Sequence, residues 1–224
     1  MSYDAIVFDL DGVLLRGYPT APAVYREATR ETLADFDVIV ESVPDRLINP
    51  DDTAEVRQFC TNHDIPPAAF WGYREHASTV RENHRITAGE REPFADTAVL
   101  PSLAEKARLG IVSNNRHGTV RFVRDYFDWG DAFGTVRGRT PTLAGYDRMK
   151  PDPHYLERTL EALGVEPVDA LFVGDRLSDV ETADRVGSDS ALLVRDGDRP
   201  TGENEPTHVI ESLRDLQPLA NNKS

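Results

Sequence analysis

The sequence is poor in cysteine, in lysine and in long apolar runs. Its one cysteine, Cys60, excludes an internal disulfide and is typical of a reducing compartment. No apolar run approaches the ~20 residues that a helix needs to span a bilayer. The first residues carry no basic stretch of the kind that opens an export signal. We therefore expect a cytoplasmic protein with no membrane partner, in which Cys60 is not a nucleophile.

The scarcity of lysine accompanies a large excess of acidic residues. Only Lys106, Lys150 and Lys223 are lysines, and 39 acidic residues against 25 basic ones give a formal net charge of −14. This charge disfavours polyanionic partners such as nucleic acid. An acid-rich, lysine-poor composition is typical of a highly saline cytoplasm, because salt screens the self-repulsion of the protein. We favour a halophilic origin, with an acidic mesophilic protein as the alternative.

The chain shows two kinds of pattern. An apolar run at 5–8, closed by Gly12, is typical of a buried strand. After about residue 90, short apolar runs alternate with helical patterns, which predicts an α/β fold with a doubly wound parallel sheet. We expect further strands at 109–112, 133–136, 170–173, 191–194 and from 209, and helices at 116–127, 152–163, 178–186 and after the last strand.

Between about residues 16 and 89 the pattern is helical only. Pro22 suits a first helical position, Asp52 can cap a helix that runs to Asn62, and 66–83 forms a third pattern rich in aromatic residues. We interpret these aromatic residues as the core of a small helical bundle. Residues 89–93 are typical of a linker. The predicted organisation is an α/β core of residues 1–15 and 90–224, with residues 16–89 inserted as a helical cap over the strand ends.

Polar side chains follow three of the predicted strands. Ligands bind at the carboxyl ends of the strands in such sheets, so these side chains should meet at one edge. They are Asp9 and Asp11 after the first strand, Ser113 and Asn114 after 109–112, and Asp175 and Asp179 after 170–173, with Lys150 at the start of a further helix.

This set of residue types suits phosphoryl transfer. Asp9 and Asp11, two residues apart at a strand exit turned by Gly12, can divide the roles of nucleophile and acid/base if their environments differ. Carboxylates need a hard cation to approach a phosphate dianion. Asp9 and Asp175 offer oxygen ligands for Mg²⁺.

Three further residues suit the phosphate itself. Ser113 and Asn114 can donate hydrogen bonds to the transferring phosphoryl group, and Lys150 can neutralise its charge. Replacing Lys150 with alanine should then reduce turnover severely with little loss of folding.

The motifs resemble those of the haloacid dehalogenase-like hydrolase superfamily over residues 4–217. The matching residues are Asp9-Leu10-Asp11-Gly12-Val13 for motif I, Ser113-Asn114 for motif II, Lys150-Pro151 for motif III, and Gly174-Asp175 through Asp179 for motif IV. The placement of the helical insertion is similar to the cap of the phosphoglycolate phosphatase-like branch. The resemblance implies Asp9 as nucleophile, Asp11 as acid/base with its backbone carbonyl on Mg²⁺, Asp175 as a metal ligand, Asp179 as a ligand or an orienting residue, and Gly12 among the phosphate-binding residues.

The leading hypothesis is a Mg²⁺-dependent phosphatase that acts on a small phosphorylated metabolite. A phosphomutase would use the same motifs. A haloacid dehalogenase needs neither Mg²⁺ nor a second motif I carboxylate, so Asp11 and Asp175 argue against it. A receiver-like signalling module would carry its phosphorylated aspartate on a later strand and would lack the helical insertion.

Substrate specificity is expected to come from the cap. Arg16, Arg74, His76 and Arg81 are candidates by location, and the loop from Arg137 to Arg148 adds positive charge. These charges would suit a substrate with a second anionic group, of which phosphoglycolate is an example. We interpret His117, His154 and His208 as structural. The composition is compatible with a monomer or a homodimer.

Overall fold

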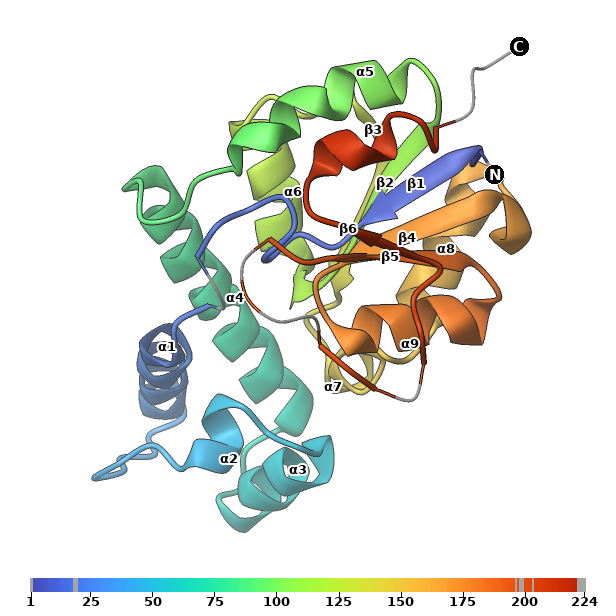
Figure 1. Cartoon of the computed structure of the whole chain (residues 1–224). Helices are drawn as coiled ribbons and strands as arrows, with labels where there is room; N and C mark the ends of the chain where they lie inside the picture. Colours follow the sequence, from blue (N-terminus) through green and yellow to red (C-terminus); the bar gives the residue numbers. More distant parts are fainter. Residues whose placement is uncertain (1, 18–19, 196, 198–199, 203, 221–224) are drawn as a thin grey trace.

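A computed structural model describes residues 2–17, 20–195, 197, 200–202 and 204–220 (Figure 1). Within these residues a parallel sheet of six strands has the order β3-β2-β1-β4-β5-β6. This confirms the predicted doubly wound α/β fold. The strands are β1 (Ala5–Phe8), β2 (Arg108–Arg116), β3 (Phe133–Arg139), β4 (Ala170–Gly174), β5 (Asp189–Leu193) and β6 (His208–Ile210).

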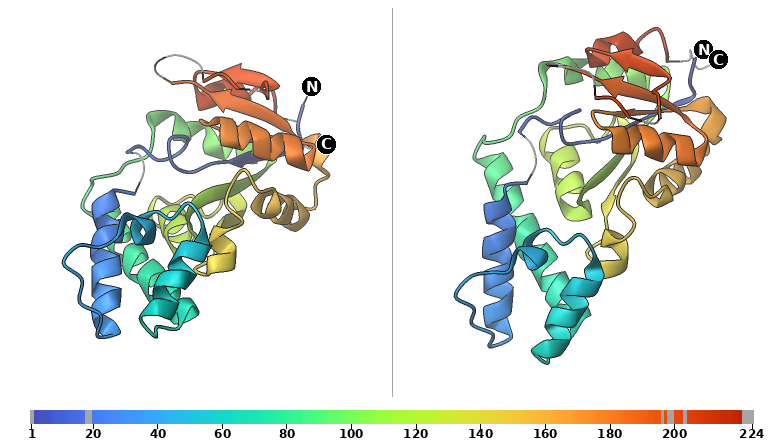
Figure 2. Two further views of the ribbon diagram at one scale, coloured as in Figure 1. Left: turned by 90° about the horizontal axis from the view of Figure 1, so that it is seen from below. Right: turned by 60° about the horizontal axis from the view of Figure 1, so that its bottom comes forward.

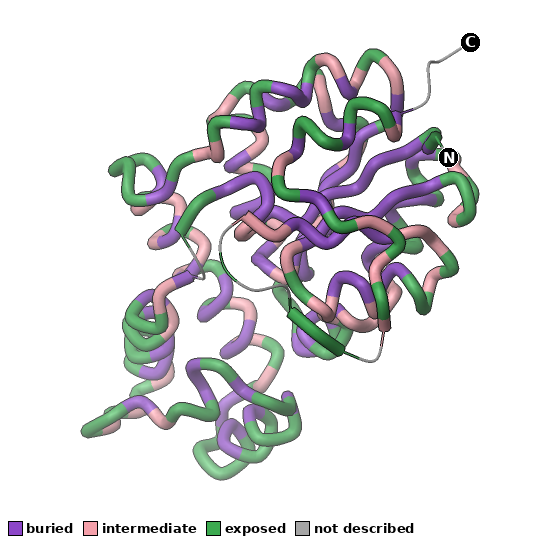
Figure 3. The backbone as a smooth tube through the Cα atoms, viewed as in Figure 1, coloured by how far each residue is buried: buried purple, intermediate pink, exposed green. Residues whose placement is uncertain are grey.

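Helices cover both faces of the sheet because the strands are apolar on both sides. Alternate residues of a strand face opposite ways. Ile6 and Phe8 of β1 therefore pack with α5 (Leu100–Ala104), α6 (His117–Tyr126) and the short helix η3 (Leu213–Leu216). Ala5 and Val7 pack on the other side with α8 (His154–Leu163) and α9 (Leu177–Val186). The buried strands form the centre of this part of the molecule in Figure 3.

Four of the helices between β1 and β2 in the chain lie together beside the sheet (Figures 1 and 2). They are α1 (Pro22–Asp35), α2 (Asp45–Ile48), α3 (Thr53–Asn62) and α4 (Pro67–Thr87). Their starts follow the sequence signals, since Pro22 and Pro67 occupy first helical positions. Asp52 accepts a hydrogen bond from the amide of Ala54 at 2.8 Å and caps α3.

These helices have a hydrophobic core of their own. Phe59, Phe70 and Trp71 pack there with Leu143 and Tyr146 of α7 (Leu143–Tyr146). Because α7 follows the carboxyl end of β3, this contact holds the helical segment against the edge of the sheet where the strands end. No helix in the described part of the chain has both the length and the apolar character to cross a membrane.

Several elements differ from the predicted bounds. β2 and β3 continue to Arg116 and Arg139 because their polar ends pair with each other. α4 continues to Thr87 rather than fading near residue 83. α8 begins at His154, after Lys150 and two prolines, so Lys150 does not open that helix.

The shorter elements show one further difference. The predicted final helix is the 3-10 helix η3. Two more short 3-10 helices, η1 (Ala95–Val99) and η2 (Pro167–Asp169), precede α5 and β4.

Candidate active site

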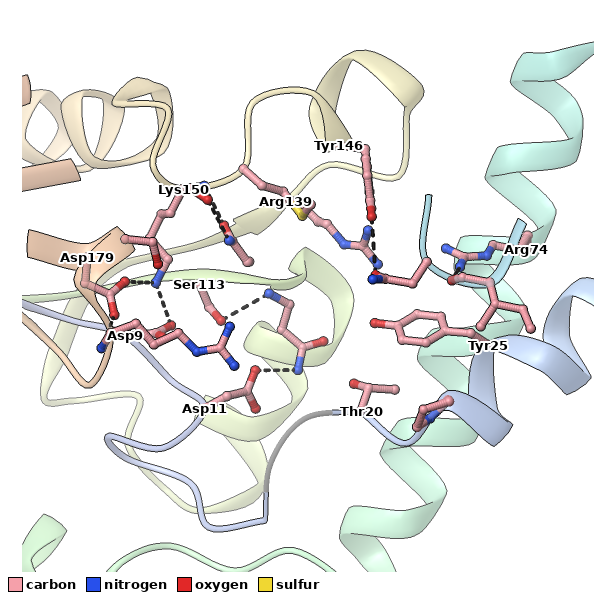
Figure 4. A pocket seen from close by; sticks show the side chains of 18 residues that line it. Asp9, Asp11, Thr20, Tyr25, Arg74, Ser113, Arg139, Tyr146, Lys150 and Asp179 are labelled. Atoms are coloured by element: carbon pink, nitrogen blue, oxygen red, sulfur yellow. Dashed lines mark hydrogen bonds and ion pairs between the residues drawn. The ribbon is translucent and has the colours of Figure 1, made fainter. Parts of the chain in front are cut away.

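The strand order brings the predicted site residues to one edge of the sheet. β1 lies between β2 and β4, so the segments that follow these three strands meet at their carboxyl ends. A cavity of about 360 Å³ opens there between the sheet edge and the helical segment (Figure 4). Of the predicted residues, its lining includes Asp9, Asp11, Ser113, Asn114, Lys150 and Asp179.

Asp9 follows the end of β1 and lies buried beside Lys150. Nζ of Lys150 is 2.9 Å from Oδ1 of Asp9 and 2.7 Å from Oδ1 of Asp179, so one ammonium group bridges two carboxylates (Figure 4). The amide of Leu10 also donates to Asp9 Oδ1 at 2.7 Å. Burial raises the pKa of Asp9 to about 7, because Lys150 only partly offsets the effects of burial and of nearby Asp179 and Asp11.

Asp175 completes a cluster of three carboxylates. Asp9, Asp175 and Asp179 each place an oxygen within 4.8 Å of the others. Two glycines allow this approach, since a Cβ on Gly12 would collide with Asp175 and one on Gly174 with Asp179. Burial and the charge of Asp179 raise the pKa of Asp175 to about 6. Oδ1 of Asp175 is buried with no hydrogen-bond partner among the described residues, so the cluster suits a hard divalent cation.

Gly12 and Asp179 also serve the local backbone. Gly12 has a φ of +85°, a conformation that glycine adopts without strain, and its amide donates to the carbonyl of Leu15 at 3.0 Å. That amide is thus paired with the backbone, and the phosphate contact of Gly12 stays a prediction. Asp179 stands in the first turn of α9 and accepts from the amide of Arg176 at 3.2 Å. Its second oxygen pairs with Lys150, so one side chain serves both the helix and the site.

The polar end of β2 places three side chains in the cavity. Asn114 accepts from the amide of Lys150 at 2.7 Å and donates to the carbonyl of Lys150 at 3.2 Å. The amide side chain of Asn114 thus fixes the backbone of Lys150, and its predicted contact with a phosphoryl group would require exchange of these bonds. Ser113 Oγ accepts from the amide of Asn115 at 3.1 Å and retains its own proton for donation to a ligand.

Asp11 is held by two residues that are distant in the sequence. Nδ2 of Asn115 donates to Oδ2 of Asp11 at 3.0 Å. Nη2 of Arg91 lies 2.6 Å from Oδ1. Arg91 belongs to the stretch predicted as a linker, but its side chain is only 1% exposed, so that part of the linker is a packed element of the site.

The far end of the cavity is cationic and aromatic. Arg74 of α4 and Arg139 at the end of β3 line it with Tyr25 and Tyr146 (Figure 4). Glu75 pairs with both arginines, at 2.5 Å from Arg74 and 3.1 Å from Arg139. One carboxylate therefore faces two buried guanidinium groups. Nε of each arginine is buried without a hydrogen-bond partner in the described chain, which leaves this end short of negative charge.

The other predicted cap residues lie elsewhere. Of the four candidates only Arg74 lines the cavity. Arg16 and His76 are exposed, and Arg81 pairs with Glu31 on α1 at 2.5 Å. In the 137–148 loop, the cationic residue that reaches the cavity is Arg139.

The histidines and the cysteine have local structural contacts. His208 contacts the hydroxyl of Tyr3 at 2.8 Å, and His117 accepts from the amide of Gly138 at 3.2 Å. His154 lies 3.4 Å from a guanidinium nitrogen of Arg148. Cys60 is buried, and burial raises its pKa to about 11, which disfavours a reactive thiolate.

Sequence reasoning missed Arg91, Asn115 and Tyr25, and it included Arg139 in a charged loop without singling it out. Their partners are far along the chain: 80 residues separate Arg91 from Asp11, and 104 separate Asn115 from Asp11. No local pattern marks such pairs. A partial signal exists for Asn115, because it directly follows Ser113-Asn114 at a strand end.

Comparison with known proteins gives a family match and several similar relatives. The family model described as haloacid dehalogenase-like hydrolase matches residues 3–187. The chain is 31% identical over 232 residues to phosphoglycolate phosphatase 1 of Pseudomonas aeruginosa, covering 96% of this chain and 79% of that protein. It is 29% identical over 193 residues to the phosphoglycolate phosphatase of Rhodospirillum rubrum, covering 82% and 76%. A solved structure of CbbY from Rhodobacter sphaeroides in complex with phosphate shares the fold, with a TM-score of 0.66 at 20% identity over 96% of each chain.

Proposed function

This chain belongs to the haloacid dehalogenase-like hydrolase family and is a phosphatase-type hydrolase, and we propose that it hydrolyses a small phosphomonoester through an aspartyl-phosphate on Asp9. The observation that carries the proposal is the placement of Asp9. This carboxylate lies in the cavity, bridged by Lys150 to Asp179 and within reach of Asp175. The names of the relatives support a phosphomonoester as the substrate.

Asp9 is the proposed nucleophile. Lys150 and the amide of Leu10 both contact its Oδ1 and fix its direction. Oδ2 is then the oxygen that attacks phosphorus, while the bond from phosphorus to the leaving oxygen breaks. The ammonium group of Lys150 also offsets the negative charge of the incoming phosphoryl group. Ser113 donates its hydroxyl proton to a phosphoryl oxygen.

Asp11 is the proposed acid and base. It gives its proton to the leaving oxygen when the aspartyl-phosphate forms. The resulting carboxylate then takes a proton from the water that attacks phosphorus, which returns both Asp11 and Asp9 to their starting forms. Asp9 and Asp11 have different surroundings, because Lys150 contacts the first and Arg91 the second. This difference is what allows two neighbouring carboxylates to take separate roles.

Mg²⁺ is the proposed cofactor. Asp9, Asp175, the backbone carbonyl of Asp11 and, directly or through orientation, Asp179 would hold it. When bound, the ion offsets the repulsion between the carboxylates and the phosphate dianion. The unpaired Oδ1 of Asp175 and the raised pKa values of Asp9 and Asp175 support this proposal, since both indicate that the cluster lacks positive charge.

The far end of the cavity supports a substrate with a second anionic group. Among the described residues, Glu75 is the carboxylate that pairs with both Arg74 and Arg139, and the ring of Tyr25 lies 4.6 Å from the guanidinium carbon of Arg74. A carboxylate of a compound such as phosphoglycolate would supply the missing negative charge. We further propose that residues 16–89 act as the cap that brings Arg74 to the substrate.

The test is phosphate release from a panel of small phosphomonoesters, with Mg²⁺ or with EDTA. The wild type should release phosphate only with Mg²⁺, and Asp9→Asn should abolish release while the fold, monitored by circular dichroism, is retained. Isomerised phosphosugar without net phosphate release would instead indicate a mutase. Full activity of a folded Asp9→Asn variant would contradict the proposal.

A further inference from the structure

Arg91 is a buried arginine at the second of the two chain crossings between the helical segment and the sheet. Residues 15 and 93 of the two crossings form an antiparallel bridge. The amide of Arg16 in the first crossing donates to the carbonyl of Glu92 in the second at 2.8 Å. Arg91 therefore lies where the two crossings run side by side, next to the loop that carries Asp11.

Three donors of the Arg91 guanidinium group point to three different partners. Nε donates to the carbonyl of Arg16 at 3.1 Å. Nη1 pairs with Oε1 of Glu82 at 2.8 Å, and Nη2 pairs with Oδ1 of Asp11 at 2.6 Å. Glu82 is 0% exposed and belongs to α4. Because a guanidinium group is planar and rigid, fixing Nε and Nη1 fixes the direction of Nη2.

The two oxygens of Asp11 consequently have different surroundings. Oδ1 faces the buried Arg91, whereas Oδ2 faces Asn115, whose side chain lines the cavity together with Asp11. A proton on Oδ1 would have to displace a charged, buried donor. A proton on Oδ2 displaces only the hydrogen bond of a neutral amide, which is weaker than one to an ionised group. Oδ2 is thus the oxygen that can exchange a proton with a substrate.

We propose that Arg91 is a positioning residue that clamps Oδ1 of Asp11, so that Oδ2 carries the proton to the leaving group. The inference rests on the proposed function, because it needs Asp11 as the acid. Glu82 contributes by anchoring the opposite edge of the same guanidinium group. Through Glu82 of α4 and Arg91, the helical segment therefore helps to orient one carboxylate oxygen of Asp11.

The test compares two leaving groups in the Mg²⁺-loaded enzyme. An alkyl phosphate such as 2-phosphoglycolate needs a proton on its leaving oxygen, whereas p-nitrophenyl phosphate releases a stable anion and needs none. Where the contacts of Arg74 are unchanged, the change in the ratio of the two kcat/KM values from the wild type reports on proton donation, because kcat/KM covers only the steps up to the departure of the leaving group. Arg91→Met should lower kcat/KM for the alkyl ester about 10²-fold and leave the aryl ester nearly unchanged.

Two variants set the scale of the effect. Asp11→Asn removes the acid and defines the largest change in the ratio. Arg195→Met is the matched control, because Arg195 forms a comparable pair with Asp96 at 2.7 Å and donates to the carbonyl of Val13 at 2.8 Å without contacting Asp11. It should lower stability without changing the ratio. A purely structural role for Arg91 predicts that Arg91→Met behaves like this control.

Two milder variants cover the case in which Arg91→Met does not fold. Arg91→Lys keeps the charge without the planar fork, and Glu82→Gln keeps Arg91 but weakens its anchor. Both should shift the ratio in the direction of Asp11→Asn, by less than that variant does. An unchanged ratio in these folded variants, beside a changed one in Asp11→Asn, would overturn the inference and leave the proposed function intact. An Asp11→Asn variant with the wild-type ratio would overturn the inference and the role of Asp11 as the acid. A wild type that releases phosphate from no ester of the panel would overturn both the inference and the proposed function.

Discussion

Replacing Lys150 tests how the buried carboxylates are held. The side chain of Lys150 is 2% exposed, and its ammonium group lies 2.9 Å from Asp9 and 2.7 Å from Asp179. Lys150→Met keeps much of the aliphatic volume and removes the charge. Asp9, Asp175 and Asp179 would then lie within 4.8 Å of one another with no cation between them.

The magnitude follows from the burial of these groups. Removing one partner of a buried ion pair costs about 3–5 kcal/mol, because the remaining charge is left uncompensated. We therefore expect Lys150→Met to lower the free energy of unfolding in EDTA by that amount. The sequence alone suggested little loss of folding, and the burial of both pairs changes that expectation. Turnover should also fall by about 10²–10³-fold, the usual effect of losing one group that stabilises a developing charge.

Urea unfolding in EDTA, followed by tryptophan fluorescence, measures the change in stability. Lys106→Met is the control, because Lys106 lies outside the carboxylate cluster and this variant should lose little stability. Mg²⁺ should stabilise the wild type, since it binds the folded state only. A Lys150→Met variant as stable as the wild type in EDTA would refute the view that Lys150 compensates buried, ionised carboxylates.

Three further predictions concern the substrate, the acid range and salt. Arg74→Gln should raise KM for 2-phosphoglycolate by about tenfold or more, because the substrate loses a hydrogen bond to a charged group. KM for p-nitrophenyl phosphate should stay unchanged. Equal effects on both esters would contradict a subsite for a second anionic group. Burial acts to raise the pKa of Asp96, but hydrogen bonds from Arg195, the amide of Leu213 and Ser212 hold it below its ordinary value. The contribution of Asp96 to the free energy of unfolding is therefore present at pH values above its pKa in the unfolded chain, near 4. This contribution is lost as the pH falls through the lower pKa of Asp96 in the folded protein. Asp96→Asn should cost about 2 kcal/mol in urea unfolding at pH 7, and less as the pH falls below 4; a loss that does not change with pH would argue against this account. Molar KCl should raise the melting temperature and activity by screening the net charge of −14, and a protein most active in dilute buffer would contradict the halophilic origin.

Local signals in the sequence predict much of the fold because they act within a few residues. Gly164 and Gly187 end α8 and α9 in left-handed conformations, as expected for a residue without Cβ. The ends of β2 and β3 were missed because Arg116 and Arg139 are polar and become strand residues only through pairing with each other. Likewise, the apolar pattern of α4 fades near residue 83 because residues such as Glu82 are polar, although Glu82 is buried against Arg91.

The candidate site divides in the same way. The residues that follow strands, such as Asp9 and Asp175, could be found because the sheet itself brings strand ends together. Arg91 and Arg139 could not, because their positions depend on how the helical segment packs against the sheet. Glu75 and Glu82 of α4 are the partners that bury them, and nothing near these residues in the chain identifies the pairs.

Asp9 is the residue proposed to carry the phosphoryl group. The most direct test is to quench the enzyme during turnover of 2-phosphoglycolate with Mg²⁺ and to reduce it with borohydride, which converts an aspartyl-phosphate to homoserine. Peptide mass spectrometry then locates the modified residue. We expect homoserine at position 9, dependent on substrate and absent in Asp9→Asn. Homoserine at the position of another aspartate would contradict this role of Asp9. So would the absence of homoserine from a sample in which the phosphoenzyme has accumulated during turnover.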